Sequence, residues 1–236
     1  MSWRRCVVAA MASAAAIVVP PVIAQSAEPP PPSVVGPIKP LGQDRYQIGR
    51  IVVDKRSHRF TVPGRVHALD KPLEYLATSP GGRKAYEALL ELDASGSEFN
   101  LACILIGLER DPKVPANKPP EAASVTGQRV GMSVAWMQDG QRRQVTAAEA
   151  LFNADARAKI ESVDWVYTGS FTSIDGSRFA ADFTGTLISF IKDPTGLIEA
   201  VSGVGVGPYG SMRGSALLPP EGSAVELIVE MAPGKK

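Results

Sequence analysis

The segment of residues 79–84 (SPGGRK) has the residue types for binding a small anion. It places two glycines and two cations just before residues 84–92, whose apolar positions recur with helical spacing. The free backbone N–H groups and the dipole at the start of a helix favour a negative charge. The spacing of a phosphate-binding loop is missing, so a glycine-rich turn with solvated charges is the alternative. The predicted contact residues are Gly81, Gly82, Lys84, Tyr86 and Glu87.

Tyr86 and Glu87 are adjacent on this predicted helix and could supply a hydroxyl and a carboxylate. Helical spacing places Tyr86 on the apolar side, so we expect it in the core, and it places Glu87 toward solvent. A catalytic role would require paired carboxylates or an activated nucleophile, and no motif supplies either. The sequence therefore assigns no catalytic residue.

The two histidines offer a different kind of chemistry. His58 and His67, with the nearby carboxylates Asp54 and Asp70, could form a metal site or an acid–base pair. A proline–glycine pair lies between the histidines, so their spacing does not fix whether they share one side, and no motif identifies a third ligand. Solvated histidines are the alternative. The prediction is therefore no metal site, and a site at His58 and His67 is the competing hypothesis.

Cysteine content argues against disulfides and metal clusters. Of the two cysteines, Cys6 lies in the predicted signal segment, which leaves Cys103 alone in the mature chain. One thiol cannot form an intramolecular disulfide or an all-cysteine iron–sulfur or zinc site, so we expect no cofactor. Cys103 lies in the apolar run of residues 101–108, which predicts a buried structural thiol. A reactive or intermolecular cysteine is the alternative.

Two motifs of known enzyme classes are incomplete. Ser170 follows Gly169, but the second glycine of a G-x-S-x-G elbow is missing, which argues against a serine hydrolase. The glycine-rich stretch of residues 203–214 lacks the third glycine of a dinucleotide fingerprint, and no helix pattern follows it. A flexible or tightly turned loop is the better interpretation of that stretch.

Strand patterns dominate the elements that would position these groups. Aromatic and β-branched residues bounded by charged turns are typical of strands. A proline–glycine pair inside the second of them indicates a bend or an edge position. The predicted strands cover residues 46–53, 59–68, 73–77, 129–137, 142–146, 163–172, 179–184, 186–192 and 225–229.

Helices are predicted over residues 84–92, 101–108 and 147–157. Thr146 is the expected N-cap of the last one, with Glu149 in the capping-box position. Because strands dominate and helices are few, the predicted fold class is α+β. We expect a largely antiparallel sheet with two to three helices in a single compact domain.

Residues 1–24 have the pattern of an export signal. Arg4 and Arg5 precede the uncharged apolar residues 6–19, and small or aliphatic residues lead to predicted cleavage after Ala24. The apolar run is shorter than the roughly 20 residues that cross a bilayer, so we expect no membrane span after signal removal. The predicted location is the periplasm or the extracellular space, by general or twin-arginine secretion.

The rest of the chain divides into a tether, a domain and a tail. Residues 25–45 are rich in proline and are predicted to be a disordered tether. Residues 46–231 form the folded domain, and residues 232–236 a disordered tail. The chain has 25 basic and 24 acidic residues, and losing Arg4 and Arg5 reverses that small excess. Without a concentrated basic face, nucleic acid is not an expected partner.

Several segments together resemble the YdjY-domain family over residues 46–231. The resemblance implies an exported bacterial domain of unknown function. Ferredoxin-like members carry a cysteine-rich motif, which Cys103 alone cannot supply, and members often have a histidine where Tyr86 stands. The matching segments are VPG at 62–64, LEYLA at 73–77, GGRKAYEALL at 81–90, WVYTGS at 165–170, ADFTG at 181–185, DP at 193–194 and PPEG at 219–222.

These observations favour a ligand-binding or structural module of the cell envelope, with an envelope protein as a further expected partner. Its contact region is predicted around Gly81, Gly82, Lys84 and Glu87. The competing hypothesis is an enzyme or metal-dependent protein that uses the two histidines and nearby carboxylates.

Overall fold

The computed structural model describes residues 35–117, 125–173, 175–202 and 210–232. The predicted signal, its cleavage site at Ala24 and the first part of the tether lie outside the described residues. So do most of the glycine-rich stretch and residues 233–236 of the tail.

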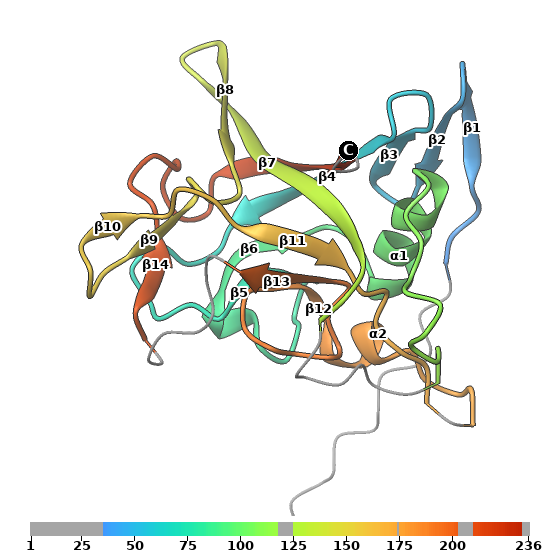
Figure 1. Cartoon of the computed structure of the whole chain (residues 1–236). Coiled ribbons are helices and arrows are strands. Elements are labelled where there is room, and N and C mark those ends of the chain that lie inside the picture. The colour runs from blue at the N-terminus through green and yellow to red at the C-terminus, as the bar shows by residue number, and fades with distance from the viewer. Residues whose placement is uncertain (1–34, 118–124, 174, 203–209, 233–236) are drawn as a thin grey trace, which may run out of the picture.

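Eight strands close into a barrel (Figure 1). The closure follows from the pairing order, because the last strand of the series, β6, pairs back with the first, β4, at Gly64 and Leu92. Neighbours are antiparallel except β12 with β13 and β5 with β6, which are parallel. In order around the barrel the strands are β4 (Arg59–Val66), β15 (Ala224–Met231), β7 (Gln128–Gln138), β11 (Asp164–Tyr167), β13 (Ile198–Ser202), β12 (Thr186–Ser189), β5 (Tyr75–Thr78) and β6 (Ala88–Leu92).

Strand β4 shows why the sequence allows this closure. Phe60, Val62 and Val66 alternate into the core, as expected for a strand with one buried face. Gly64 lies between them where β6 crosses, and a Cβ there would be 2.3 Å from the Glu91 carbonyl oxygen. The first part of β4 pairs with β3, and the part that begins at Gly64 pairs with β6. The proline–glycine pair therefore marks the change of partner, and the strand continues through it.

Further strands extend the barrel wall. β3 (Ile51–Asp54), β2 (Arg45–Ile48) and β1 (Lys39–Gly42) continue antiparallel from β4, and β8 (Gln141–Thr146) forms a hairpin with β7. β1 belongs to residues that the sequence assigns to the tether, so the ordered sheet begins earlier than predicted. A separate small sheet contains β10 (Ala158–Lys159), β9 (Leu151–Asn153) and β14 (Met212–Gly214).

The described helices are short (Figure 1). They are α1 (Gly96–Leu105), α2 (Ala180–Thr184) and the 3₁₀ turn η1 (Ala85–Glu87). α1 contacts β3, β12 and α2, and its Phe99 packs edge-on against Phe60 of β4 with ring centroids 5.1 Å apart. Neither described α-helix has the length and apolar character that a bilayer-spanning segment requires.

The predicted α+β class is wrong. The fold is mostly β, with only about 10% helix, and its sheet closes into a barrel, which the predicted largely antiparallel sheet with two to three helices did not include. The clearest error lies at residues 84–92, where the predicted helix is η1 followed by β6. All five residues of β6 are buried, so the strand has no exposed face to give a period of two. Its apolar residues could therefore be mistaken for a helical pattern.

Two other predictions are wrong: the predicted helix over residues 147–157 contains strand β9, and a predicted strand contains helix α2. The predicted capping box exists, since Glu149 Oε2 accepts from Thr146 N at 2.8 Å, but it closes only a turn before β9. Residues 179–184, predicted as a strand, contain α2. The strands predicted over 59–68, 129–137 and 225–229 are confirmed, as is the hairpin into β8.

Candidate functional site

The predicted anion-binding segment connects β5 to η1 and does not start an α-helix. Three of its backbone N–H groups are already used, and two of them bind the end of α2: Ser79 N donates to Gly185 O at 2.8 Å, and Arg83 N donates to Thr184 O at 2.8 Å. Gly82 N donates to Ser79 O at 3.0 Å. The segment is thus fastened to the C-terminal end of α2, and the Gly82 N–H group is not free to bind an anion.

Lys84, Tyr86 and Glu87 come together, but their exposure is the reverse of the prediction. Tyr86 is 56% exposed, whereas Glu87 is only 6% exposed. Lys84 Nζ lies 3.2 Å from Tyr86 Oη and 3.3 Å from Glu87 Oε2. These two hydrogen bonds raise the pKa of Lys84. The cation is therefore held by its own neighbours, which makes it a weak recognition group for an anion.

Glu87 also belongs to a group of acidic side chains near the start of β5. Burial, followed by the nearby Glu87 carboxylate, raises the pKa of Glu74. Burial and the Asp193 carboxylate raise the pKa of Tyr75 as well. Asp193 is held by Thr195, whose N and Oγ1 donate to its Oδ1 at 2.9 and 2.6 Å. Within the described residues, no group of three His, Cys, Asp or Glu side chains is placed to hold a metal ion.

Glu199 is the most deeply buried carboxyl near this group, with 2% of its surface exposed. It lies on β13 between Val166 of β11 and Ser189 of β12. Burial, and then the Asp193 charge, raise the pKa of Glu199 to about 8. Its Oε1 has no hydrogen-bond partner among the described residues. Glu199 is therefore protonated at neutral pH, as a carboxyl in an apolar environment should be.

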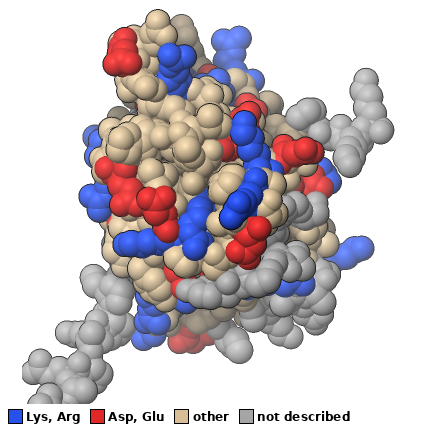
Figure 2. Space-filling view, turned by 90° about the vertical axis from the view of Figure 1, so that its left-hand side faces the viewer, with Lys and Arg blue, Asp and Glu red and all other residues tan. Residues whose placement is uncertain are grey.

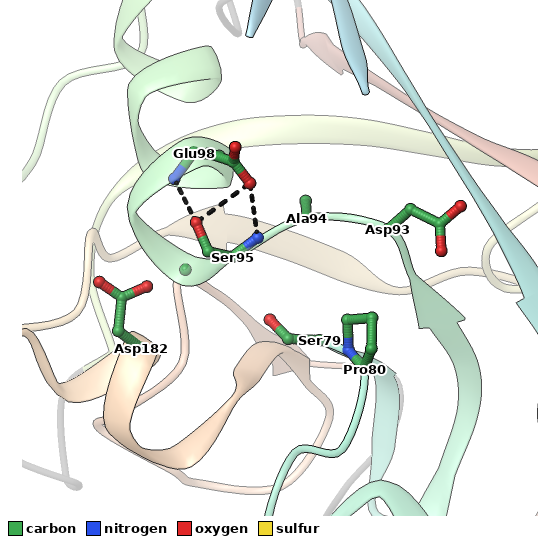
Figure 3. A pocket seen from close by; sticks show the side chains of 8 residues that line it. Ser79, Pro80, Asp93, Ala94, Ser95, Glu98 and Asp182 are labelled. Atoms are coloured by element: carbon green, nitrogen blue, oxygen red, sulfur yellow. Dashed lines mark hydrogen bonds between the residues drawn. The ribbon is translucent and has the colours of Figure 1, made fainter. Parts of the chain in front are cut away.

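A pocket of about 340 Å³ lies beside the predicted segment, at the start of α1 (Figure 3). We call it the α1 pocket. Its volume is at the small end of the range that small-molecule sites occupy, about 300–1,000 Å³. The β5–η1 loop, the connection from β6 to α1, and α2 each supply part of the wall. The lining residues are Ser79, Pro80, Asp93, Ala94, Ser95, Gly96, Glu98 and Asp182.

The acidic side chains of the α1 pocket are fixed by structural contacts. Ser95 caps α1 and exchanges hydrogen bonds with Glu98, whose Oε2 accepts from Ser95 N at 2.9 Å. Asp182 accepts from the backbone N and the hydroxyl of Ser97. Asp93 points away from the other two in Figure 3 and pairs with Arg50 at 2.7 Å. Three carboxylates and one guanidinium give the surroundings of the pocket a negative balance.

Ser79 is the polar group of this pocket that remains unsatisfied. It is 9% exposed, and its Oγ has no hydrogen-bond partner among the described residues. Figure 3 shows the hydroxyl pointing from the loop toward the first turn of α1, across the pocket. Leaving a buried hydroxyl unpaired costs about 1–3 kcal/mol, which a bound polar group would recover.

A comparison with protein families matches the YdjY domain to residues 51–230. The chain belongs to the YdjY domain family. No curated protein and no solved structure was found to match it. The matched residues of the YdjY domain run from β3 to β15, so they contain the whole barrel, both α-helices and the α1 pocket. The match lies within residues 46–231, over which the sequence resembles this family.

The two histidines of this YdjY domain do not form a shared site. His58 precedes β4 and His67 follows it, so the length of an eight-residue strand separates them. His58 Nδ1 lies 2.9 Å from the Ile106 carbonyl oxygen beyond the end of α1, while His67 N donates to Leu89 O. A metal site or acid–base pair built on both imidazoles is therefore not supported by the geometry.

Cys103 is buried in α1, as predicted for a structural thiol of the YdjY domain. Burial raises the pKa of Cys103 well above its usual value. The neutral thiol is a poor nucleophile, so this side chain acts as part of the core.

The segment of residues 79–84 that the sequence singles out supplies one wall of the α1 pocket, and most of the pocket was not predicted. Ser79 was within the predicted segment, whereas Asp93, Ser95, Glu98 and Asp182 were not predicted. The pattern Ser95-x-x-Glu98 is the usual signature of a capping box and could have located the start of α1. No sequence signal brings Asp182 to this place, because its contact with Ser97 joins segments 85 residues apart.

Proposed function

We propose that this YdjY domain is an exported ligand-binding module of the cell envelope, and that the α1 pocket binds a small organic cation. The export signal pattern of residues 1–24 supports the location. The barrel serves as a rigid scaffold for the loop, the helix start and α2, which supply the pocket walls. This role requires no catalytic residue.

The observation that carries the proposal is the unpaired hydroxyl of Ser79. Buried polar atoms in native proteins nearly always have partners. Ser79 Oγ lacks one among the described residues and faces a pocket that is large enough for a ligand. A ligand N–H group would satisfy it.

The charge of the pocket selects the class of ligand. Asp93, Glu98 and Asp182 outnumber Arg50, so an anion would be repelled and a cation attracted. Two of these carboxylates, Glu98 and Asp182, are also committed to α1. Because they already accept hydrogen bonds from α1, they are not free to coordinate a metal ion. Their negative potential can still attract an ammonium group.

The test uses three four-carbon probes that differ only in their end groups. Isothermal titration of the mature protein with 1,4-diaminobutane should give saturable binding. 1,4-Butanediol and succinate should bind at least tenfold more weakly. Equal affinity for the diol would contradict the charge argument, and binding of succinate alone would overturn the proposal.

A pair of variants separates recognition from folding. Ser79→Ala removes the hydroxyl in the pocket, and Thr78→Val removes the hydroxyl of the adjacent residue. Thr78 Oγ1 is also buried without a partner among the described residues, but Thr78 does not line the α1 pocket. We expect Ser79→Ala to weaken diaminobutane binding about tenfold and Thr78→Val to leave it unchanged. Equal effects of the two substitutions would remove Ser79 from the site.

The export part of the proposal has its own test. Mass spectrometry of protein from the periplasmic or culture fraction should give a chain that begins at Gln25. A full-length chain retained in the cytoplasm would contradict it.

A further inference from the structure

A second pocket lies on the opposite side of the molecule from α1, beside the small sheet. It has a volume of about 560 Å³, and we call it the β14 pocket. Figure 2 looks at the side of the molecule that carries this sheet, and acidic and basic side chains are interspersed there. The pocket walls are mainly apolar, from Leu69, Phe152, Leu218 and Pro220, with Asp70 and Arg213 as the charged residues. A mainly apolar lining with few polar groups is typical of small-molecule sites.

Arg213 is held in place by backbone carbonyls. Its Nη1 donates to Met212 O at 2.8 Å and also to Gly210 O. Within the described residues, the hydrogen bonds of this guanidinium use Nη1 alone. Nε and Nη2 therefore remain as donors on a group whose position is already fixed. An anchored guanidinium binds a carboxylate with less loss of side-chain entropy than a mobile one.

Asp70 is held near Arg213 through the backbone. Gly214 N donates to Leu69 O at 2.8 Å, and these two residues are the chain neighbours of Arg213 and Asp70. A Cβ on Gly214 would lie 2.6 Å from Leu69 Cδ2, so the two segments are in close contact. Leu69 N also donates to Glu221 Oε1 at 2.7 Å. The N–H group and the carbonyl group of Leu69, the residue before Asp70, are therefore both hydrogen-bonded.

The two charges do not neutralise each other directly. Asp70 is exposed and forms no ion pair within the described residues, although a basic group lines the same pocket. The β14 pocket thus offers an anchored guanidinium and an exposed carboxylate whose neighbouring backbone is held in place, beside an apolar wall. A ligand with a single charge would pair with one of these groups and be repelled by the other, whereas a zwitterion would pair with both.

We infer that the β14 pocket binds a small zwitterion with an apolar body, an apolar amino acid or dipeptide. Its carboxylate contacts Arg213, its ammonium contacts Asp70, and its side chain packs against Phe152 and Leu69. This site and its ligand are separate from the cation site at α1. Failure of either proposal therefore leaves the other standing.

The first experiment compares matched ligands by titration of the mature protein. L-Phenylalanine and the dipeptide Leu-Phe carry both charges, phenylalaninamide lacks the carboxylate, and N-acetylphenylalanine lacks the ammonium. We expect at least one zwitterion to bind tenfold or more tightly than both blocked compounds. The zwitterion with the higher affinity shows whether the pocket prefers a free amino acid or a dipeptide. Equal affinity of a blocked compound, or no binding of either zwitterion, would overturn the inference.

The second experiment assigns the charges. Asp70→Asn should weaken binding of the zwitterion about tenfold and leave any residual binding of N-acetylphenylalanine unchanged. Because Asp70 is exposed and unpaired in the described residues, this substitution should not disturb folding. The Tm of the variant serves as the control and should be unchanged. Full zwitterion affinity in Asp70→Asn would contradict the proposed orientation.

Discussion

Ser79 Oγ and Glu199 Oε1 are both buried oxygen atoms without a partner among the described residues, but their surroundings differ. Ser79 lines a pocket of about 340 Å³. Glu199 lies in the barrel wall between Val166 and Ser189. A ligand can satisfy the hydroxyl, whereas the carboxyl is stabilised by keeping its proton. An unpaired buried atom therefore indicates a binding site only when a cavity adjoins it, and in a buried carboxyl group without a cavity it accompanies a raised pKa.

The largest expected effect concerns Glu199. Its pKa is about 8 in the folded chain against a usual value of 4.5, so the folded state keeps a proton that the unfolded state has released. The stability that this proton provides is complete below about pH 4.5 and is lost as the pH rises toward 8. At about 1.4 kcal/mol per pH unit, the upper limit of the loss is roughly 5 kcal/mol.

Glu199→Gln tests this directly, because glutamine is neutral at every pH. We expect similar free energies of unfolding for the two proteins at pH 5, and a more stable variant at pH 8.5. Urea unfolding at both pH values measures the difference. Parallel pH dependences in the two proteins would mean that Glu199 is not the titrating group, and Glu74, whose pKa is also raised, would be examined next.

An intermediate effect is expected at the other serine of the α1 pocket. Ser95 accepts from Glu98 N at 3.2 Å and caps α1, so Ser95→Ala should lower the free energy of unfolding by about 1 kcal/mol. Thermal unfolding would show this as a lower Tm. A Tm equal to that of the wild type would mean that the capping box does not stabilise α1.

The smallest loss of stability is expected for Ser79→Ala. The substitution removes a buried hydroxyl that has no partner among the described residues, so the free energy of unfolding should stay the same or rise, by at most the about 1–3 kcal/mol that an unpaired hydroxyl costs. Urea unfolding of Ser79→Ala and Ser95→Ala under the same conditions compares the free energies of unfolding of the two variants. A loss of 1 kcal/mol or more would show that Ser79 has a structural partner.

The sequence predicted strands well where one face is buried and the other is not. β4 and β7 alternate in this way, and their predicted bounds agree with the structure to within two residues. β6 was missed because both of its faces are buried. The error at β6 also reversed the expected exposure of Tyr86 and Glu87, since the helical period placed the tyrosine inward.

The barrel and the pockets could not be predicted because they depend on contacts between distant segments. Closure requires β6 to pair with β4, and only the absence of a Cβ at Gly64 hints at a close crossing. The α1 pocket requires Asp182 beside Ser97, and the β14 pocket requires Leu69 beside Gly214. No local pattern encodes these pairs. Chemical reasoning on the glycine-rich loop came near the α1 pocket, but it predicted an anion, whereas we propose a cation.

The most direct test of the proposed function is a crystal structure of the mature protein soaked with 1,4-diaminobutane. We predict one ammonium group within about 2.7–3.2 Å of Ser79 Oγ, inside the α1 pocket. Density for the diamine elsewhere, with the α1 pocket holding only water at saturating concentration, would contradict it.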